Sequence, residues 1–167
     1  MSKFWRVRRA LVLWCVPVIL LTAAFTGCVK KIPFIGPPGP IRVDMMVRAL
    51  PQLNEGNSRQ GNPVIFCVYQ LQNDVKFREA TSEIFWREGE KILEKDLLTA
   101  KYETTLYPDK TQVLNLKILP ETKFIGFAAN FHTPDAQRWH LVVTVGAVRN
   151  KNVIIEAGKD FLNMTNR

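Results

Sequence analysis

The stretch IRVDMMVRA, residues 41–49, decides the fold because its apolar and polar residues alternate with period two. One face of an extended chain here carries Ile41, Val43, Met45, Val47 and Ala49. The opposite face carries Arg42, Asp44 and Arg48. Such alternation is typical of a strand with one face in a core and the other in solvent. The stretch therefore predicts the first strand of a half-buried sheet.

A second stretch, NPVIFCVYQL at residues 62–71, is almost continuously apolar from Pro63 to Leu71. This composition is typical of a central strand that is buried on both faces. Five later segments also have strand-like composition, with turn-forming residues such as Gly146–Lys151 between them. They are Lys101–Leu106, Gln112–Leu119, Lys123–Phe131, Gln137–Val145 and Asn152–Ala157. The sequence therefore predicts about seven short strands.

The segment Asn73–Leu98, between the second and third predicted strands, lacks this alternation. Its apolar residues recur at roughly helical spacing with charged residues between them, which predicts one or two short helices. These apolar residues are Ile84, Phe85, Ile92, Leu93 and Leu97. Many short strands with one helical insertion indicate a mainly β fold, a two-sheet β-sandwich with a small helical cap.

The basic charge of the chain is concentrated at its start. The formal net charge is +8, and removal of residues 1–27 would take away four positive and no negative charges, leaving +4. The four cations are Lys3, Arg6, Arg8 and Arg9. The remaining cations are scattered and form no dense basic run of the kind that binds phosphates. We therefore expect the protein not to bind nucleic acid. With 47% hydrophobic and 23% charged residues, the chain is expected to fold.

Residues 1–27 follow the plan of a secretory signal peptide: a basic region, an apolar stretch at Ala10–Ala24 and small residues at the end. The apolar stretch is shorter than the roughly 20 residues that cross a bilayer, and it contains Pro17. The residues Phe25–Cys28 resemble the lipobox of bacterial lipoproteins, in which the cysteine is acylated, with palmitate for example, and becomes the new N-terminus. We therefore expect Cys28 to carry a covalent lipid. The alternative is an ordinary signal peptide followed by an incidental cysteine.

Residues 28–40 are expected to form the lipidated cysteine and an extended tether, because residues 29–40 hold four prolines and two glycines. The β-sandwich domain is then residues 41–167. Val29 follows the cysteine in place of the aspartate that retains lipoproteins at the inner membrane, so the periplasmic face of the outer membrane is the expected location. Cys67 is left without a disulfide partner, and its apolar neighbours predict a buried thiol.

The sequence lacks the usual catalytic motifs. Serine occurs at positions 2, 58 and 82, and none lies in a Gly-x-Ser-x-Gly elbow. No phosphate-binding glycine loop is present. His132 and His140 flank a turn, but no cluster of cysteines or carboxylates completes a metal site around them. We therefore expect no enzyme activity, cofactor, metal or small-molecule substrate, and a periplasmic enzyme or metal carrier centred on these histidines remains the alternative.

The chain resembles the TssJ family, the outer-membrane lipoproteins of the bacterial type VI secretion system. The similar blocks occur in the family's order and cover almost the whole chain. They are Cys28, Ile41–Asp44, Asn62–Leu71, Phe77–Leu98, Thr122–Ala129, Phe131 and Arg138–Trp139. The resemblance implies a transthyretin-like two-sheet β-sandwich with a helical insertion at about residues 73–98.

The resemblance also implies a non-catalytic role in the type VI membrane complex. The family's lipoprotein binds the periplasmic C-terminal region of the inner-membrane subunit TssM and, through it, associates with TssL. A lipoprotein chaperone or pilotin for another envelope machine is the alternative function.

In the family, the loop that joins the first two strands contacts TssM, and here that loop is Pro51–Asn62. Leu53 is the only apolar residue after Pro51 in it, so we expect Leu53 to be an exposed anchor. The polar rim of the binding loop would come from Gln52, Asn54, Glu55 and Arg59. The alternative is that the loop is merely a tolerated insertion.

Overall fold

The computed structural model describes residues 38–57, 59–149 and 153–166. The predicted signal peptide, Cys28 and the tether as far as Pro37 lie outside the described residues. The elements follow in the order β1 (Ile41–Ala49), β2 (Val64–Leu71), α2 (Val75–Glu79), α3 (Ser82–Leu93), η2 (Glu94–Asp96), β3 (Tyr102–Leu106), β4 (Thr111–Ile118), β5 (Phe124–Ala129), β6 (His140–Thr144), α4 (Val145–Arg149), β7 (Val153–Ala157) and β8 (Leu162–Asn166). Within the described ranges, no helix has the length and apolarity needed to span a bilayer.

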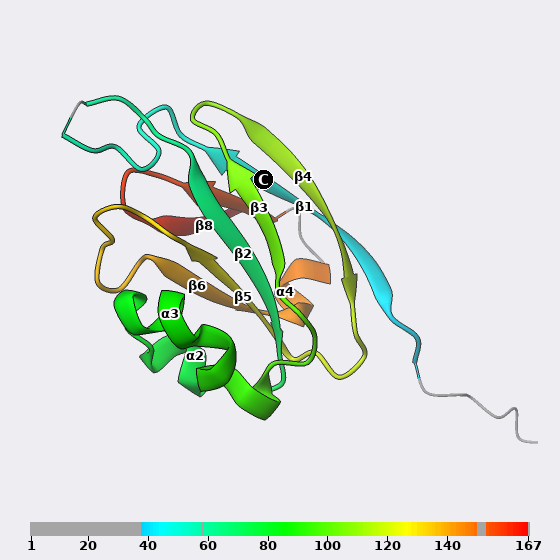
Figure 1. The fold of residues 1–167 in the computed structure, drawn as a ribbon. Coiled ribbons are helices and arrows are strands. Elements are labelled where there is room, and N and C mark those ends of the chain that lie inside the picture. The colour runs from blue at the N-terminus through cyan, green and yellow to red at the C-terminus, as the bar shows by residue number, and fades with distance from the viewer. Residues whose placement is uncertain (1–37, 58, 150–152, 167) are drawn as a thin grey trace, which may run out of the picture. The chain divides into compact units, whose positions relative to one another are not determined.

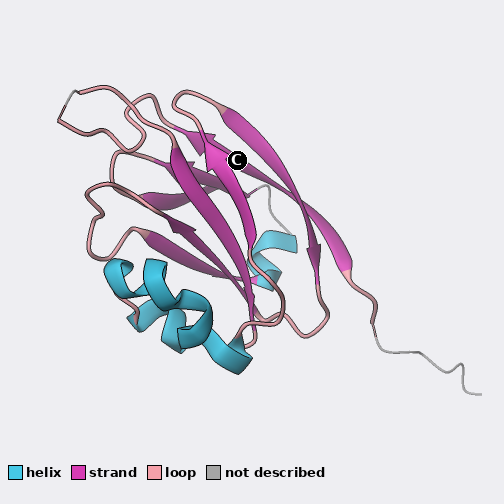
Figure 2. Cartoon of the chain, in the orientation of Figure 1, coloured by secondary structure: helices cyan, strands magenta, loops and turns pink. Residues whose placement is uncertain are grey.

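The domain is built from two four-stranded sheets, ordered β4-β1-β7-β8 and β3-β2-β5-β6 (Figure 1). In the first sheet β1 lies between β4, to which it is antiparallel, and β7, to which it is parallel. The second sheet is antiparallel throughout. The helices α2 and α3 lie against the second sheet (Figure 2). The predicted mainly β, two-sheet sandwich with a helical insertion between the second and third strands is thus confirmed.

Two elements differ from the sequence prediction. The structure adds β8, so the described residues hold eight strands instead of about seven. The sequence of β8, LNMTN, has only two apolar residues, and its strand conformation comes from pairing with β7 (Ile155 with Met164, Ala157 with Leu162). The predicted turn at Gly146–Lys151 is largely the short helix α4, which begins directly after β6.

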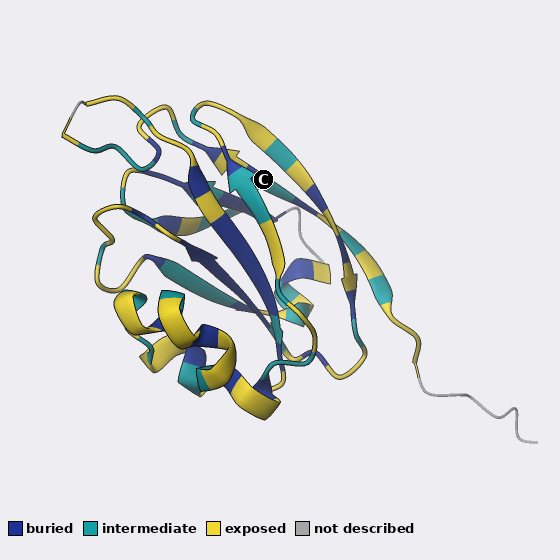
Figure 3. Cartoon of the chain, viewed as in Figure 1, coloured by how far each residue is buried: buried dark blue, intermediate teal, exposed yellow. Residues whose placement is uncertain are grey.

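The alternation in β1 has the predicted result. Met45, Val47 and Ala49 are buried, Ile41 and Val43 are half-buried, and the side chains expected on the opposite face are exposed (Figure 3). Those exposed residues are Arg42, Asp44 and Arg48. Because β1 pairs on both sides, its buried face lies in the middle of the first sheet. The hydrophobic pattern therefore fixes the register of β1.

The strand β2 is largely apolar because most of both faces is covered; the exceptions are Ile65, which is 41% exposed, and the half-buried Gln70. On one face Phe66 stacks on Phe127, with ring centroids 6.0 Å apart. On the other face Tyr69 contacts the helical insertion through Phe77 and Phe85, at 5.4 and 5.3 Å between centroids. Cys67 is completely buried, as predicted, and desolvation raises its pKa to about 11. A thiol with this pKa stays protonated at neutral pH.

The helical insertion approaches the second sheet most closely at Gly126. A Cβ atom on Gly126 would lie 2.8 Å from Cζ of Phe77, which is closer than side-chain atoms normally pack. Phe77 also contacts Phe85 of α3, with centroids 5.1 Å apart. The absence of a side chain at residue 126 therefore lets the aromatic layer of the insertion lie directly on β5.

We expect Gly126→Ala to lower the free energy of unfolding by about 1–3 kcal/mol, because the new methyl group must displace the Phe77 ring from a packed layer. Gly146→Ala is the matched control, since it lies in the helix α4 and, among the described residues beyond its chain neighbours and its own helix backbone, no atom lies within 4 Å of the added Cβ. Urea unfolding of both variants and of the original chain measures the difference. Equal stability of Gly126→Ala and the original chain would show that the Phe77 ring can move aside for a methyl group at no cost.

Candidate partner-binding surface

The loop between β1 and β2 lies at the end of the sandwich opposite to the start of β1 (Figure 1). β1 belongs to one sheet and β2 to the other, so the loop must cross from sheet to sheet. The connections β5–β6 and β7–β8 are found at the same end. Residues from distant parts of the sequence are therefore neighbours of this loop.

Leu53 is not the exposed anchor expected from the sequence. Its exposed fraction is 0%, and it belongs to the hydrophobic core. Its backbone N–H donates to the Leu50 carbonyl at 3.0 Å, and its carbonyl accepts from the Asn62 N–H at 2.8 Å. The physical reason is that an apolar side chain at the open end of a sandwich gains more from filling the core than from facing water. Leu53 therefore fixes the loop from within.

Asn54 is half-buried and is hydrogen-bonded within the chain. Its side-chain Oδ1 accepts from the His132 backbone N–H at 2.7 Å, and its Nδ2 donates to the Pro63 carbonyl at 3.1 Å. Its backbone N–H donates to the Gly158 carbonyl at 3.2 Å. The amide proposed for the polar rim is thus already engaged within the chain at both of its polar atoms.

The second half of the loop packs closely at its base. A Cβ on Gly61 would collide with the Pro51 carbonyl oxygen and lie 3.0 Å from Cβ of Pro108. Asn62 donates from Nδ2 to the carbonyls of Gln60, at 3.0 Å, and Asn54, at 3.2 Å. Side-chain amides thereby satisfy carbonyls that would otherwise need water. The base of the loop is ordered by internal contacts.

The predicted rim residues differ in how far they reach solvent. Gln52 and Arg59 are exposed, whereas Glu55 is half-buried. Arg59 has a φ of +55°, a backbone conformation in which arginine is uncommon. The side chains of Gln52 and Arg59 therefore remain the most accessible of the predicted set.

Sequence reasoning missed two neighbours of the loop. His132 reaches it through the backbone bond to Asn54, and the turn that follows β3 reaches it through Pro108 and Gly61. Next to Pro108, Tyr107 is 53% exposed and is the large aromatic residue offered to solvent by that turn. The folded structure brings these turns next to residues 51–62. The local sequence pattern therefore could not predict the contacts between them.

The two histidines lie in different surroundings. His132 is exposed, whereas the His140 ring packs between Trp139 and Phe77, with centroids 4.4 and 5.5 Å away. Desolvation lowers the pKa of His140. Among the described residues, no group of three or more potential ligands gathers that could hold a metal ion. His140 is therefore part of the aromatic layer beneath the helical insertion.

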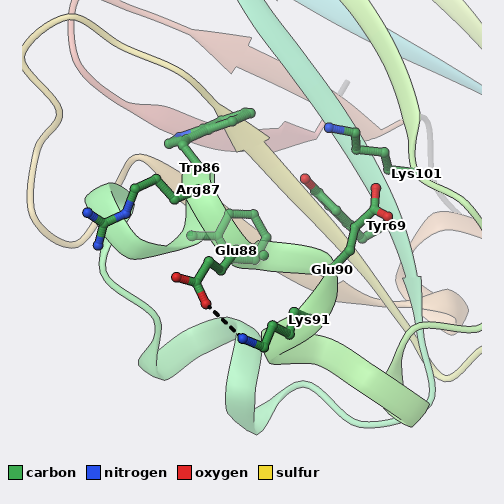
Figure 4. A pocket seen from close by; sticks show the side chains of 9 residues that line it. Tyr69, Trp86, Arg87, Glu88, Glu90, Lys91 and Lys101 are labelled. Carbon is green, nitrogen blue, oxygen red and sulfur yellow. Dashed lines mark hydrogen bonds and ion pairs between the residues drawn. The ribbon is translucent and has the colours of Figure 1, made fainter.

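A pocket of about 350 Å³ lies beside α3 and is lined in part by Tyr69 and Phe85 of the aromatic layer (Figure 4). The Tyr69 hydroxyl and the Lys101 and Glu90 side chains border one side of it, and the Trp86 ring borders the other. Its charged rim mixes both signs, and its three cations are paired with carboxylates of the chain. These pairs are Glu83–Arg87 at 4.0 Å, Glu88–Lys91 at 3.4 Å and Lys101–Glu103 at 3.0 Å. The rim therefore has little charge left to select a ligand.

The fold and the internally bonded β1–β2 loop define the class of protein. It is a small two-sheet β-sandwich with a helical insertion on one sheet and an ordered polar loop at one end. A family model described as "Type VI secretion lipoprotein, VasD, EvfM, TssJ" matches residues 41–160. The chain belongs to this family, whose members are structural lipoproteins of the secretion complex. The resemblance seen in the sequence is thereby confirmed.

Solved structures agree with this assignment. The T6SS lipoprotein TssJ1 from Pseudomonas aeruginosa matches with a TM-score of 0.69 and 25% identity, over 77% of this chain and 97% of that chain. Serratia marcescens Lip, titled a membrane bound component of the Type VI Secretion System, matches with a TM-score of 0.67 and 20% identity, over 77% and 98%. A structure titled "T6SS protein TssM C-terminal domain (869-1107) from EAEC" contains a chain that matches with a TM-score of 0.66 and 20% identity, over 74% and 97%. The latter two show the shared fold. A comparison with curated proteins gave no match.

We expect Leu53→Ala to lower the free energy of unfolding by about 2–4 kcal/mol, because it removes a fully buried side chain from the core. Gln52→Ala, at the exposed neighbouring position, should change stability by less than about 0.5 kcal/mol. Chemical denaturation of the two variants makes the comparison. A Leu53→Ala protein as stable as Gln52→Ala would contradict the burial of Leu53 and favour a position at the surface.

Proposed function

We propose that this protein is an outer-membrane lipoprotein that anchors the type VI secretion membrane complex by binding the periplasmic C-terminal region of a TssM-like inner-membrane subunit. The observation that carries the proposal is the match of residues 41–160 to the family of type VI secretion lipoproteins. The protein would act without catalysis or a cofactor, and TssL would associate with it through the TssM-like subunit. The lipid on Cys28 would hold it at the periplasmic face of the outer membrane.

The choice of partner is supported by a structural neighbour. A chain with this fold occurs in a structure whose title names the TssM C-terminal domain. That title speaks of the related protein, and the partner of the present chain is inferred from it. Residues 51–62 are the proposed contact because the loop is long for a β connection, polar and exposed at Gln52 and Arg59.

The arrangement of the domain suits an anchor. The chain enters β1 at Ile41, and the loop follows the other end of this nine-residue strand, about 26 Å away at 3.3 Å per residue. The tether would therefore join the domain at the end opposite to the loop. Residues 28–40 could span at most about 45 Å when extended. A tether of this length would let the loop reach into the periplasm.

Replacing Cys28 by serine should move the protein from the membrane fraction to the soluble periplasmic fraction, because acyl chains contribute about 0.8 kcal/mol of membrane affinity per buried methylene. Fractionation with sedimentation on a sucrose gradient measures the distribution. Cys67→Ser is the matched control, since this thiol is buried in the domain. Retention of Cys28→Ser in the outer-membrane fraction would contradict anchoring through this cysteine.

Arg59→Asp should weaken binding of the TssM-like subunit by about tenfold or more, since arginine is prominent among residues that dominate interfaces. Aspartate tolerates the positive φ at this position, so the backbone of the loop should be kept. Lys95→Asp makes the same charge change at an exposed site in η2 and should bind normally. Affinity capture from detergent-solubilised envelopes, with tagged full-length protein and mass spectrometry, measures the captured partner.

Capture of a TssM-like protein by the original chain and by Lys95→Asp, with loss in Arg59→Asp, supports the proposal. Capture of a secretin or pilin instead would favour a pilotin or chaperone. Equal capture by Arg59→Asp and Lys95→Asp would remove Arg59 from the interface while leaving the choice of partner intact.

A further inference from the structure

Asn54 joins three separate loops at the end of the sandwich. Its own loop is closed onto the start of β2 by the Nδ2 bond to the Pro63 carbonyl, at 3.1 Å. The connection between β5 and β6 is bound by Oδ1, which accepts from the His132 N–H at 2.7 Å. The connection between β7 and β8 is bound by the backbone N–H, which donates to the Gly158 carbonyl at 3.2 Å. One residue therefore sets the relative positions of all three.

Asparagine is the residue that suits this position. Its planar amide offers an acceptor and a donor on one short side chain, and both are used here. Its φ is +48°, in the left-handed region that asparagine adopts more readily than most residues. Glycine would tolerate the backbone but form neither side-chain bond, and aspartate would keep only the acceptor.

The β5–β6 connection is also fixed at its far side. The Asp135 N–H donates to the Asp160 carbonyl at 3.0 Å, and Asp135 Oδ1 accepts from the N–H groups of Gln137 and Arg138 at 2.9 and 3.0 Å. Between these two fixed points the segment 132–134 is exposed. This segment is therefore presented to solvent at a set distance from the β1–β2 loop.

We propose that Asn54 is a positioning residue for a composite docking surface, formed by the exposed part of the β1–β2 loop together with His132–Pro134. This inference rests on the proposed function, since the occupant is the periplasmic C-terminal region of the TssM-like subunit. Asn54 does not touch the partner. It holds the two segments in the arrangement that the partner binds, so that the ordering cost is met before the partner arrives.

The chemistry of the surface favours a polar partner segment. Arg59 and Gln52 on one side and His132 on the other are exposed and polar, while the apolar side chain of the loop, Leu53, is turned into the core. Polar groups such as these contribute affinity through hydrogen bonds, which need fixed geometry. The arrangement set by Asn54 therefore matters more for partner affinity here than it would on an apolar surface that adapts to its partner.

Three variants separate positioning from contact. Asn54→Gly keeps the positive φ and removes both side-chain bonds. Asn54→Asp keeps the acceptor for His132 and removes the donor to Pro63. His132→Ala removes an exposed side chain but leaves the backbone N–H bonded to Asn54. Each is measured as full-length lipidated protein in detergent, for binding of the TssM-like C-terminal region by calorimetry and for hydrogen exchange of the unbound protein.

Asn54→Gly should raise the Kd by about tenfold or more, with a less favourable binding entropy, and should speed exchange of the His132 amide. Asn54→Asp should keep the protection of that amide and lose less affinity. His132→Ala should raise the Kd while the protection of the residue 132 amide is unchanged. A stabilising role of Asn54 alone would not change the binding entropy of variants that remain folded.

Two outcomes would overturn the inference. The first is normal affinity in Asn54→Gly despite fast exchange at residue 132, and the second is normal affinity in His132→Ala. If Asn54→Gly fails to fold, normal affinity in His132→Ala would still overturn the inference. Failure of the original chain to bind the TssM-like region would instead count against the proposed function, and the exchange data would still report whether Asn54 orders the β5–β6 connection.

Discussion

The crossing of the chain from one sheet to the other between β1 and β2 is the constraint on which the end of the molecule depends. Consecutive strands of one sheet can be joined by a two-residue turn, but strands in different sheets need a connection that passes over the open end of the core. Leu53 fills the core beneath that connection, and the bond from the Asn62 N–H to its carbonyl closes the loop above it. The position of Asn54, and with it the contacts to His132 and Gly158, follows from the burial of the preceding leucine.

The strands were predictable because their patterns are local. Alternation in residues 41–49 and the apolar run at 64–71 each predict how many faces of a strand are buried, and the structure agrees except at Ile65, which is exposed. β8 was missed because its strand conformation depends on β7 more than on its own five residues. The helix α4 was missed because a five-residue helix is too short to show a periodic pattern.

The site was less predictable than the fold, and Leu53 shows why. A single apolar residue in a polar loop shows no periodic pattern. From the sequence alone, its side chain is therefore expected to be exposed, like the apolar anchors of protein interfaces. Its burial is a property of the folded core, to which strands from distant parts of the sequence contribute. A lone leucine among glycines and asparagines is itself a signal, however, because leucine is among the residues most often fully buried. That signal favours an internal plug over an exposed anchor.

The helical insertion and the end loops are stabilised by different interactions. The helical insertion covers the second sheet with an aromatic layer that leaves room for no side chain at Gly126, and it buries Tyr69 and His140 in surroundings that disfavour their charged forms. The end loops contain polar side chains instead, and several of these bond to backbone carbonyls and amides of neighbouring turns. Buried apolar area holds the first region together, whereas directional bonds hold the second. A surface built from directional bonds can discriminate between partners of similar shape, because a wrong partner leaves its polar groups unpaired at a cost comparable to a lost hydrogen bond.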